Sequence, residues 1–283
     1  MAVIFGLLTA FFFGAGDFCG GLSAKRVSVL AVVAFSHLVG LIGVAILTPF
    51  LAEQFVWADL FIGMVAGASG GVGVALLYRG LARGPMVVVA PLTAITSAAV
   101  PSLWGVITGE TFSGRAWVGI VIALAAIVMI SIPNSANNDG AANAPITSSV
   151  VIESLISGSM FGLMFILFDA TSEVSAPWPV VGARILTSGL LVGVMVTQRR
   201  SELGSLRPAL PTIILTGLFD TGSNTLFLFA TNVGDLAIVA VLSSLYPVTT
   251  VLLARVVLNE RMSRLQLGGL LAALTATALI AAG

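Results

Sequence analysis

Residues 117–145 read WVGIVIALAAIVMISIPNSANNDGAANAP, and this stretch decides the fold. Its first part, through Ile132, is apolar and carries no ionisable side chain. A run of this kind approaches the about 20 apolar residues that cross the hydrocarbon core of a bilayer. Its second part is rich in Asn, Gly and Pro, which is typical of a linker. The stretch therefore predicts a membrane span followed by a polar linker near the midpoint of the chain.

The composition extends this prediction to the whole sequence. Of the 283 residues 58% are hydrophobic and 8% are charged, whereas a soluble chain carries about 25% charged residues. The formal net charge of +0 gives no indication of a nucleic acid partner. The single cysteine, Cys19, and the single histidine, His37, exclude an intramolecular disulfide and a two-histidine zinc site. We expect an all-α protein in the lipid bilayer, without a cofactor, in a bacterial inner (plasma) membrane.

Ten apolar runs of span length follow one another along the chain. The first has no Lys or Arg before it, so we interpret it as a retained span rather than a secretory signal. The runs are Ala2–Leu22, Val29–Leu51, Trp57–Leu77, Met86–Ile107, Trp117–Ile132, Val150–Phe168, Pro179–Thr197, Leu210–Ala230, Leu236–Leu258 and Leu265–Ala282.

The two halves of the sequence are similar at an offset of 150 residues. Glu110 then aligns with Glu260, and Gly119 aligns with Gly269. We predict a first five-helix repeat over residues 1–133, a linker over 134–149 and a second repeat over 150–283. An odd number of spans per repeat inverts the second copy, an arrangement typical of secondary transporters with a site at the repeat interface.

Basic residues gather in alternate loops, which predicts the orientation in the membrane. Even-numbered loops hold only Arg115, so we expect the odd-numbered loops to be cytoplasmic and both termini to lie outside. The odd-numbered loops hold Lys25, Arg26, Arg79, Arg83, Arg199, Arg200, Arg207, Arg261 and Arg264.

The proline- and glycine-containing fourth span, with Gly109-Glu110 at its end, and the matching Asn259-Glu260 carry a family resemblance. The chain resembles the EamA-type branch of the drug/metabolite transporter superfamily, and within it the amino-acid exporters. Tyr246-Pro247 stands where that family has its helix proline. The resemblance implies a ten-helix secondary carrier with a central cavity, lined by helices 1–4 and 6–9, with helices 5 and 10 outside.

Ionisable residues inside a span normally face the interior of the bundle, since exposure to lipid is costly. Asp17 on the first span and His37 on the second lie at similar depths when counted from the loop between them. We predict that this pair touches the transport pathway and carries a proton, because His titrates nearest neutral pH. A hydrogen-bonded pair that only fixes packing is the alternative.

Arg184 on the seventh span and Asp220 on the eighth form a second candidate pair. An unpaired charge in a dry interior would be very costly, so the two side chains are expected to meet. They form either a structural ion pair or a pair that opens to bind a zwitterion. Asn224 lies one turn after Asp220 on the same face and is a candidate for orienting a polar substrate group.

Aromatic side chains complete the predicted substrate site. Trp104 and Tyr246 lie deep in the fourth and ninth spans, and Tyr78 ends the third. Tyr246 is the strongest of these candidates, because Pro247 breaks a backbone hydrogen bond beside it and a buried Tyr needs a polar partner. Glu110 is expected to cap a helix or pair with an Arg.

These observations predict a secondary transporter that exports amino acids or related small metabolites by alternating access, facilitated or proton-coupled. Its partners would be a small zwitterionic molecule and lipid, and a monomer would suffice. A multidrug or nucleotide-sugar carrier is an alternative within transport. A non-transporting scaffold or sensor subunit and a membrane-embedded transferase are alternatives from other classes.

Overall fold

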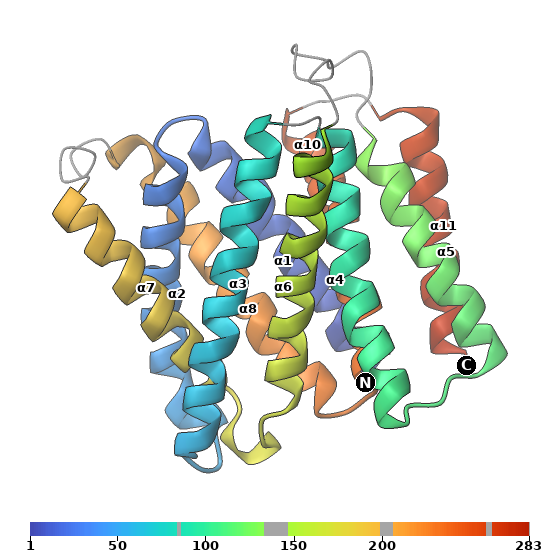
Figure 1. The fold of residues 1–283 in the computed structure, drawn as a ribbon, viewed down its shortest axis with the longest axis horizontal. Coiled ribbons are helices and arrows are strands. Elements are labelled where there is room, and N and C mark those ends of the chain that lie inside the picture. Colours follow the sequence, from blue (N-terminus) through green and yellow to red (C-terminus); the bar gives the residue numbers. More distant parts are fainter. Residues whose placement is uncertain (84–85, 133–146, 199–205, 259–261, 283) are drawn as a thin grey trace.

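The chain, seen in a computed structural model, is a bundle of helices that run back and forth along one common direction (Figure 1). The structure describes residues 1–83, 86–132, 147–198, 206–258 and 262–282. The helices are α1 (Ala2–Ala24), α2 (Val29–Leu51), α3 (Trp57–Arg83), α4 (Met86–Thr108), α5 (Gly114–Ser131), α6 (Ser148–Asp169), η3 (Glu173–Ser175), α7 (Trp178–Gln198), η5 (Arg207–Ala209), α8 (Leu210–Thr231), α9 (Leu236–Ser243), α10 (Tyr246–Leu258) and α11 (Arg264–Ala281).

Eight helical segments within these ranges are long and apolar enough to cross a membrane. One of them, Leu236–Leu258, combines α9 and α10. The sequence predicts ten spans, and the two that fall short are Leu92–Thr108 in α4 and Arg264–Ile280 in α11. Arg264–Ile280 is shorter than the about 20 residues of a full crossing, whereas α4 as a whole has 23 residues, from Met86 to Thr108. The architecture is therefore an all-α, multi-pass membrane protein with eight candidate spans among the described residues.

Short polar side chains start several of these helices. The hydroxyl of Ser28 accepts a hydrogen bond from the backbone N–H of Ala31, and that of Ser113 accepts one from Ala116. At α11, Ser263 and Gln266 form a reciprocal capping box. Each such cap satisfies a backbone N–H that has no partner inside its own helix. The turns between apolar runs are thus defined locally by the sequence.

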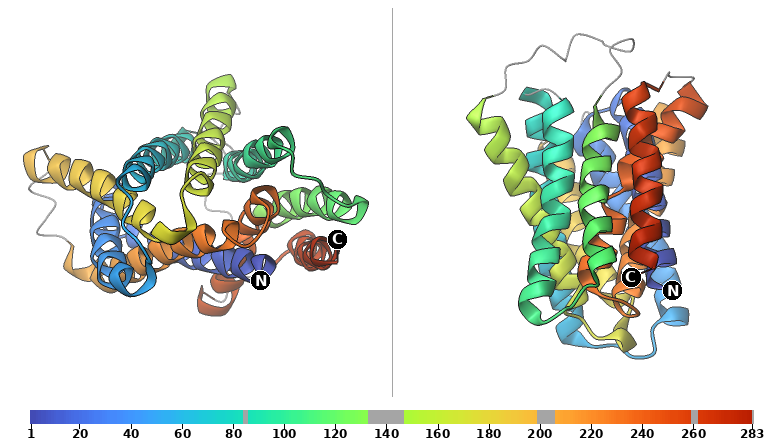
Figure 2. Two further views of the ribbon diagram at one scale, coloured as in Figure 1. Left: turned by 90° about the horizontal axis from the view of Figure 1, so that it is seen from below. Right: turned by 90° about the vertical axis from the view of Figure 1, so that its right-hand side faces the viewer.

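The closest helix pairs each join one helix from the first half of the chain to one from the second half. α1 lies along α8, α3 lies along α6 and α7, and α2 contacts α7 and α8. α4 contacts α6 and α9, while α5 and α11 pack on each other at one edge of the bundle (Figures 1 and 2). Most of the interior is therefore built from helices that are distant in sequence.

Glycines allow two of these contacts to be unusually close. A Cβ atom on Gly14 of α1 would lie 2.4 Å from the carbonyl oxygen of Tyr246 on α10. A Cβ atom on Gly67 of α3 would lie 2.6 Å from the carbonyl oxygen of Ala183 on α7. Small residues at such crossings let helix backbones approach in a membrane protein. These two contacts bring α10 and α7 against the centre of the bundle.

The predicted ninth span is interrupted. α9 ends at Ser243 and α10 begins at Tyr246, with a turn at Ser244 and Leu245 between them. Pro247 has no N–H with which to continue the helical ladder to Ser243. The sequence prediction that Pro247 breaks a backbone hydrogen bond here is confirmed as a break between two helices.

Glu110, in the connection between α4 and α5, caps a helix from the far end of the chain. Its carboxylate accepts hydrogen bonds from the backbone N–H groups of Leu236, at 2.8 Å, and Ala237, at 3.2 Å. The predicted capping role is thus confirmed, with α9 as the helix that is capped. Burial raises the pKa of the Glu110 carboxyl, against the effect of these two hydrogen bonds. Its sequence counterpart Glu260 lies outside the described residues.

The two termini lie at one end of the bundle, and the α1–α2 connection lies at the other (Figure 1). The end with the α1–α2 connection carries Lys25 and Arg26. Residues 134–146 of the predicted linker, 134–149, lie outside the described part of the chain. α6 begins at Ser148, two residues before the predicted start of the second repeat, and the hydroxyl of Thr147 caps it.

A candidate substrate site inside the helix bundle

A cavity opens among helices α1, α2, α3, α4, α6, α7, α8, α9 and α10. It encloses about 910 Å³ of space between atoms, including solvent at its mouth. None of the described residues of α5 or α11 lines it. The expectation drawn from the family resemblance, that these two helices stand outside the cavity, is confirmed for the described residues.

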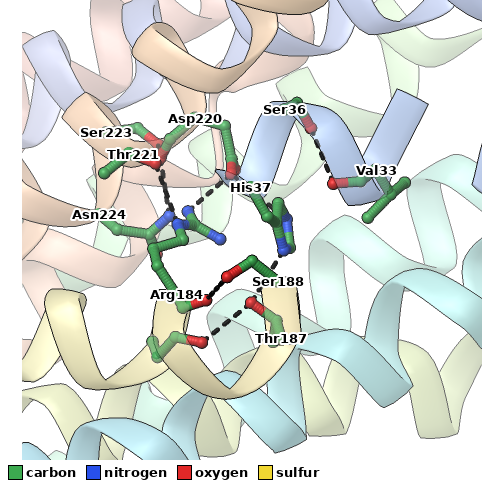
Figure 3. Close-up of polar contacts among 11 residues, drawn as sticks. Val33, Ser36, His37, Arg184, Thr187, Ser188, Asp220, Thr221, Ser223 and Asn224 are labelled. Carbon is green, nitrogen blue, oxygen red and sulfur yellow. Dashed lines mark hydrogen bonds and ion pairs between the residues drawn. The ribbon is translucent and has the colours of Figure 1, made fainter. Parts of the chain in front are cut away.

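The ion pair between Arg184 and Asp220 lies in the wall of this cavity. Nη2 of Arg184 is 2.6 Å from Oδ2 of Asp220, and Nε of Arg184 donates to the hydroxyl of Thr221 at 3.0 Å (Figure 3). Arg184 is 6% exposed. Its long side chain extends from α7 to Asp220 on α8, as the sequence predicted. The predicted pair is therefore present, with the guanidinium buried and the carboxylate partly exposed.

His37 faces the same carboxylate from α2. Its Nδ1 is 2.9 Å from the hydroxyl of Thr187, and its Nε2 is 3.7 Å from Oδ2 of Asp220 (Figure 3). The Thr187 hydroxyl donates its proton to the carbonyl of Ala183, so it accepts from Nδ1–H of His37. Nε2 is then the position at which a proton would be gained or lost, facing a carboxylate oxygen that Arg184 also contacts.

Asp17 lines the cavity from α1, where its side chain is exposed. Asp220 and Tyr246 line the same cavity. No hydrogen bond or ion pair joins Asp17 to His37 in the described part of the chain. The predicted Asp17–His37 pair is not formed, because the imidazole turns toward Thr187 and Asp220 on α7 and α8.

Asn224 and Ser243 place two buried polar atoms in the cavity wall without a partner. The amide nitrogen of Asn224 donates to the backbone carbonyl of Asp220 at 2.7 Å, while Oδ1 of Asn224 has no hydrogen bond. The hydroxyl oxygen of Ser243, at the end of α9, also has none. Asn224 is 4% exposed and Ser243 is 1% exposed, so each atom bears a desolvation cost that a ligand could offset.

Aromatic side chains form the apolar wall. The rings of Phe13 and Tyr246 meet edge to face with centroids 6.4 Å apart, and Phe13 and Phe165 are 6.2 Å apart. All three residues line the cavity. Tyr246 therefore lies beside the break between α9 and α10, in the place the sequence suggested for it.

One of the predicted aromatic site residues, Trp104, is not brought to the cavity by the structure. Trp104 lies on α4 with 44% of its surface exposed, and it does not line the cavity. The reason is helical phase: its neighbour Ile107 on the same side of α4 is 77% exposed. Tyr78 lies on α3, but its side chain is outside the described part of the structure. Metal binding has no candidate, because no cluster of three His, Cys, Asp or Glu side chains occurs among the described residues.

Sequence reasoning missed several polar residues of the site. Thr187 and Thr221 hold His37 and Arg184 in place, and Ser243 and Ser244 flank the helix break. Thr187 could have been found from its spacing, since it lies three residues after Arg184 and so shares its helix face. The only feature of the sequence that could have indicated Ser243 is its position four residues before Pro247.

The chain resembles known proteins over most of its length. The model of the EamA-like transporter family matches residues 1–132 and 148–282. Among 29 matching chains of solved structures, one described only as the crystal structure of a protein is 17% identical in sequence. It has a TM-score of 0.70, with 98% of this chain and 95% of that chain covered, and the likeness concerns the fold. No curated protein matches the chain.

Proposed function

The chain belongs to the EamA-like transporter family, and from that premise we propose that it is a secondary carrier that exports amino acids or related small zwitterionic metabolites. The observation that carries the proposal is the single cavity that places an Arg184–Asp220 ion pair, a further carboxylate and an aromatic wall within one bundle of membrane helices. Both signs of charge beside apolar surface suit a zwitterion with an apolar side chain.

The carrier would work by alternating access of two inverted five-helix repeats, in which α4 and α11 are the fourth and tenth spans and join the eight candidate spans. The helix contacts support this division. Exchanging α1 with α6, α2 with α7, α3 with α8, α4 with α9–α10 and α5 with α11 converts the contact of α1 with α8 into that of α6 with α3. The same exchange converts the contact of α3 with α7 into that of α8 with α2.

Two glycine contacts support the same relationship at atomic level. A Cβ atom on Gly14 of α1 would lie 2.4 Å from the carbonyl oxygen of Tyr246, and one on Gly158 of α6 would lie 2.5 Å from that of Thr93. The two matched stretches of the family model, 1–132 and 148–282, are separated by residues 133–147, which include most of the predicted linker. Repeats of this kind move against each other around a site at their interface.

Substrate would bind by opening the contact between Arg184 and Asp220. The guanidinium presents a planar set of donors that suits a carboxylate. A proton on Nε2 of His37 would compete with Arg184 for Oδ2 of Asp220, since both approach this one oxygen, at 3.7 and 2.6 Å. Protonation of His37 and substrate binding at Arg184 would in this way be linked through Asp220, and this linkage would couple flux to a proton gradient.

Counterflow in proteoliposomes tests the proposal. Purified protein is reconstituted with an unlabelled amino acid inside, and entry of labelled Phe, Trp, Thr or Met is followed. Saturable exchange that Arg184→Gln abolishes is the expected result. Folded protein that exchanges none of these amino acids above empty liposomes would exclude them as substrates and leave drugs or nucleotide sugars to be tried.

A cationic amphipathic drug is the second candidate substrate, on one specific observation. Asp17 has no cationic partner among the described residues and shares the cavity with Phe13, Phe165 and Tyr246. A nucleotide sugar fits less well, because Arg184 is the only Lys or Arg among the described residues that line the cavity, and a diphosphate favours several.

A further inference from the structure

We propose that Asp17, Asn224 and Ser243 form a subsite for a primary ammonium group, separate from the Arg184–Asp220 pair. The inference rests on the proposed function, since it assigns the part of the cavity that takes the amino group of the substrate. It also predicts which ligands bind, and this prediction can be tested without measuring transport.

The backbone of α1 fixes where Asp17 lies. A Cβ atom on Gly14, one turn before Asp17, would lie 2.4 Å from the Tyr246 carbonyl oxygen on α10. A Cβ atom on Gly16 would lie 3.3 Å from the backbone nitrogen of Asp220 on α8. The α1 helix thus touches α10 and α8 directly around Asp17, and the carboxylate enters the cavity between the helix that carries Asn224 and the helix that follows Ser243.

The cations of the site are directed elsewhere. Nη2 of Arg184 and Nε2 of His37 both face Oδ2 of Asp220. Within the described residues, no ion pair or hydrogen bond involves the Asp17 carboxylate. Arg184 therefore neutralises Asp220, and the Asp17 carboxyl group has no partner among the described residues that would compete with a ligand.

Two polar atoms of residues that line the same cavity have no hydrogen-bond partner. Oδ1 of Asn224 can only accept, and the orientation of this amide is set by its nitrogen, which donates to the Asp220 carbonyl at 2.7 Å. The hydroxyl oxygen of Ser243 is also without a partner. Beside it, Pro247 leaves the Ser243 carbonyl without its usual helical donor. The Asn224 oxygen therefore requires a ligand that brings a donor, and the Ser243 hydroxyl oxygen can accept from the same group.

A primary ammonium group has the required chemistry, with one positive charge and three N–H donors. A carboxylate or phosphate brings acceptors and negative charge, and Asp17 would repel it. A quaternary ammonium group brings the charge but no donor, so it would leave Asn224 and Ser243 unsatisfied. The subsite should therefore distinguish a primary amine from a quaternary one of similar size and charge.

Four phenyl compounds test this distinction on the purified protein. They are L-phenylalanine, phenethylamine, 3-phenylpropionate and benzyltrimethylammonium, and the readout is the apparent Tm in detergent as a function of ligand concentration. Phenethylamine is expected to stabilise the protein at concentrations about tenfold lower than the other two single-charge compounds, as loss of a hydrogen bond to a charged group predicts. Asn224→Leu and Ser243→Ala should each remove most of this preference.

Ser159→Ala is the matched control, because the Ser159 hydroxyl bonds within its own helix to the Leu155 carbonyl at 2.9 Å and does not line the cavity. It should leave the preference unchanged. Equal stabilisation by benzyltrimethylammonium and phenethylamine would overturn the subsite, as would variants that weaken all four ligands alike. Counterflow of labelled phenylalanine separates the two proposals: phenethylamine binding that depends on Asn224, without any amino-acid exchange, would retain the subsite and overturn the transport function.

Discussion

The imidazole of His37 and the hydroxyl of Thr187 are in hydrogen-bond contact at 2.9 Å, and 150 residues separate them in the chain. This is the same offset at which Glu110 aligns with Glu260 and Gly119 with Gly269. If the two halves are related by a two-fold axis, α2 and α7 exchange places across it, and His37 and Thr187 occupy corresponding positions. The contact would then mark the axis, with the Arg184–Asp220 pair directly beside it.

Replacing His37 with Gln should uncouple flux from a proton gradient. Gln can still hydrogen-bond to Thr187 but has no titratable nitrogen opposite Asp220. A gradient of one pH unit provides about 1.4 kcal/mol, or tenfold accumulation at one proton per substrate. We expect this accumulation in wild-type proteoliposomes and its loss in the variant, with equal-pH counterflow retained. Thr187→Val, which keeps the imidazole, should preserve some gradient dependence, and wild-type accumulation by His37→Gln would contradict the proposed role.

Removing one charge of the Arg184–Asp220 pair should lower the stability of the protein, and removing the second charge as well should cost less than it does alone. Asp220→Asn leaves a guanidinium that is 6% exposed without its counter-ion, which costs roughly 3 kcal/mol or more. The double variant Arg184→Gln/Asp220→Asn should destabilise by less than the sum of the single variants. Thermal unfolding in detergent of the four proteins of this cycle measures the coupling. Additive effects on unfolding would mean that the pair contributes no stability of its own.

Glu110→Gln should lower stability by about 1 kcal/mol, the usual cost of losing a helix cap. The amide provides one acceptor oxygen where the carboxylate provides two, so one of the N–H groups of Leu236 and Ala237 loses its bond. Asp235→Asn serves as the control, because the Asp235 side chain makes no capping hydrogen bond. A loss of stability in the control as large as in Glu110→Gln would assign the effect to the charge at this end of the bundle.

The stability contributed by Glu110 should also depend on pH with a defined sign. Its pKa is raised in the folded protein, chiefly by burial, so the folded state holds the proton more tightly than the unfolded state. The corresponding stability is fully present below the unfolded pKa and is lost as the pH rises through the folded one. Wild type should therefore lose stability relative to Glu110→Gln as the pH is raised across this interval. An apparent Tm difference that stays constant from pH 4 to 7 would contradict the shift.

Gly14→Ala should destabilise the bundle, whereas Gly21→Ala should not. A Cβ atom on Gly14 would lie 2.4 Å from a backbone carbonyl oxygen that cannot easily move, while one on Gly21 meets nothing within 4 Å. Both residues lie on α1, so the helix propensity gained from Ala, up to about 1 kcal/mol, is shared. The difference in apparent Tm between the two variants isolates the contact between α1 and α10. Equal Tm values would mean that the two helices are separated by more than the structure shows.

The sequence by itself determined the environment, the helical class and the identity of most charged site residues. Long continuous runs without charge favour helices in a membrane chain, because a helix satisfies its backbone N–H groups within its own segment. For the same reason Asp17, His37, Arg184 and Asp220 were recognisable as interior residues, since lipid exposure would be costly at each position.

Tertiary structure alone decided how these residues pair. The hydropathy pattern is nearly uniform around each helix, so it does not show which face of α2 meets α7 or which face of α4 turns outward. His37 therefore bonds to Thr187 rather than Asp17, and Trp104 lies on the outside. The unpartnered oxygens of Asn224 and Ser243 arise from the same cause, because contacts between helices far apart in sequence determine which polar atoms are satisfied.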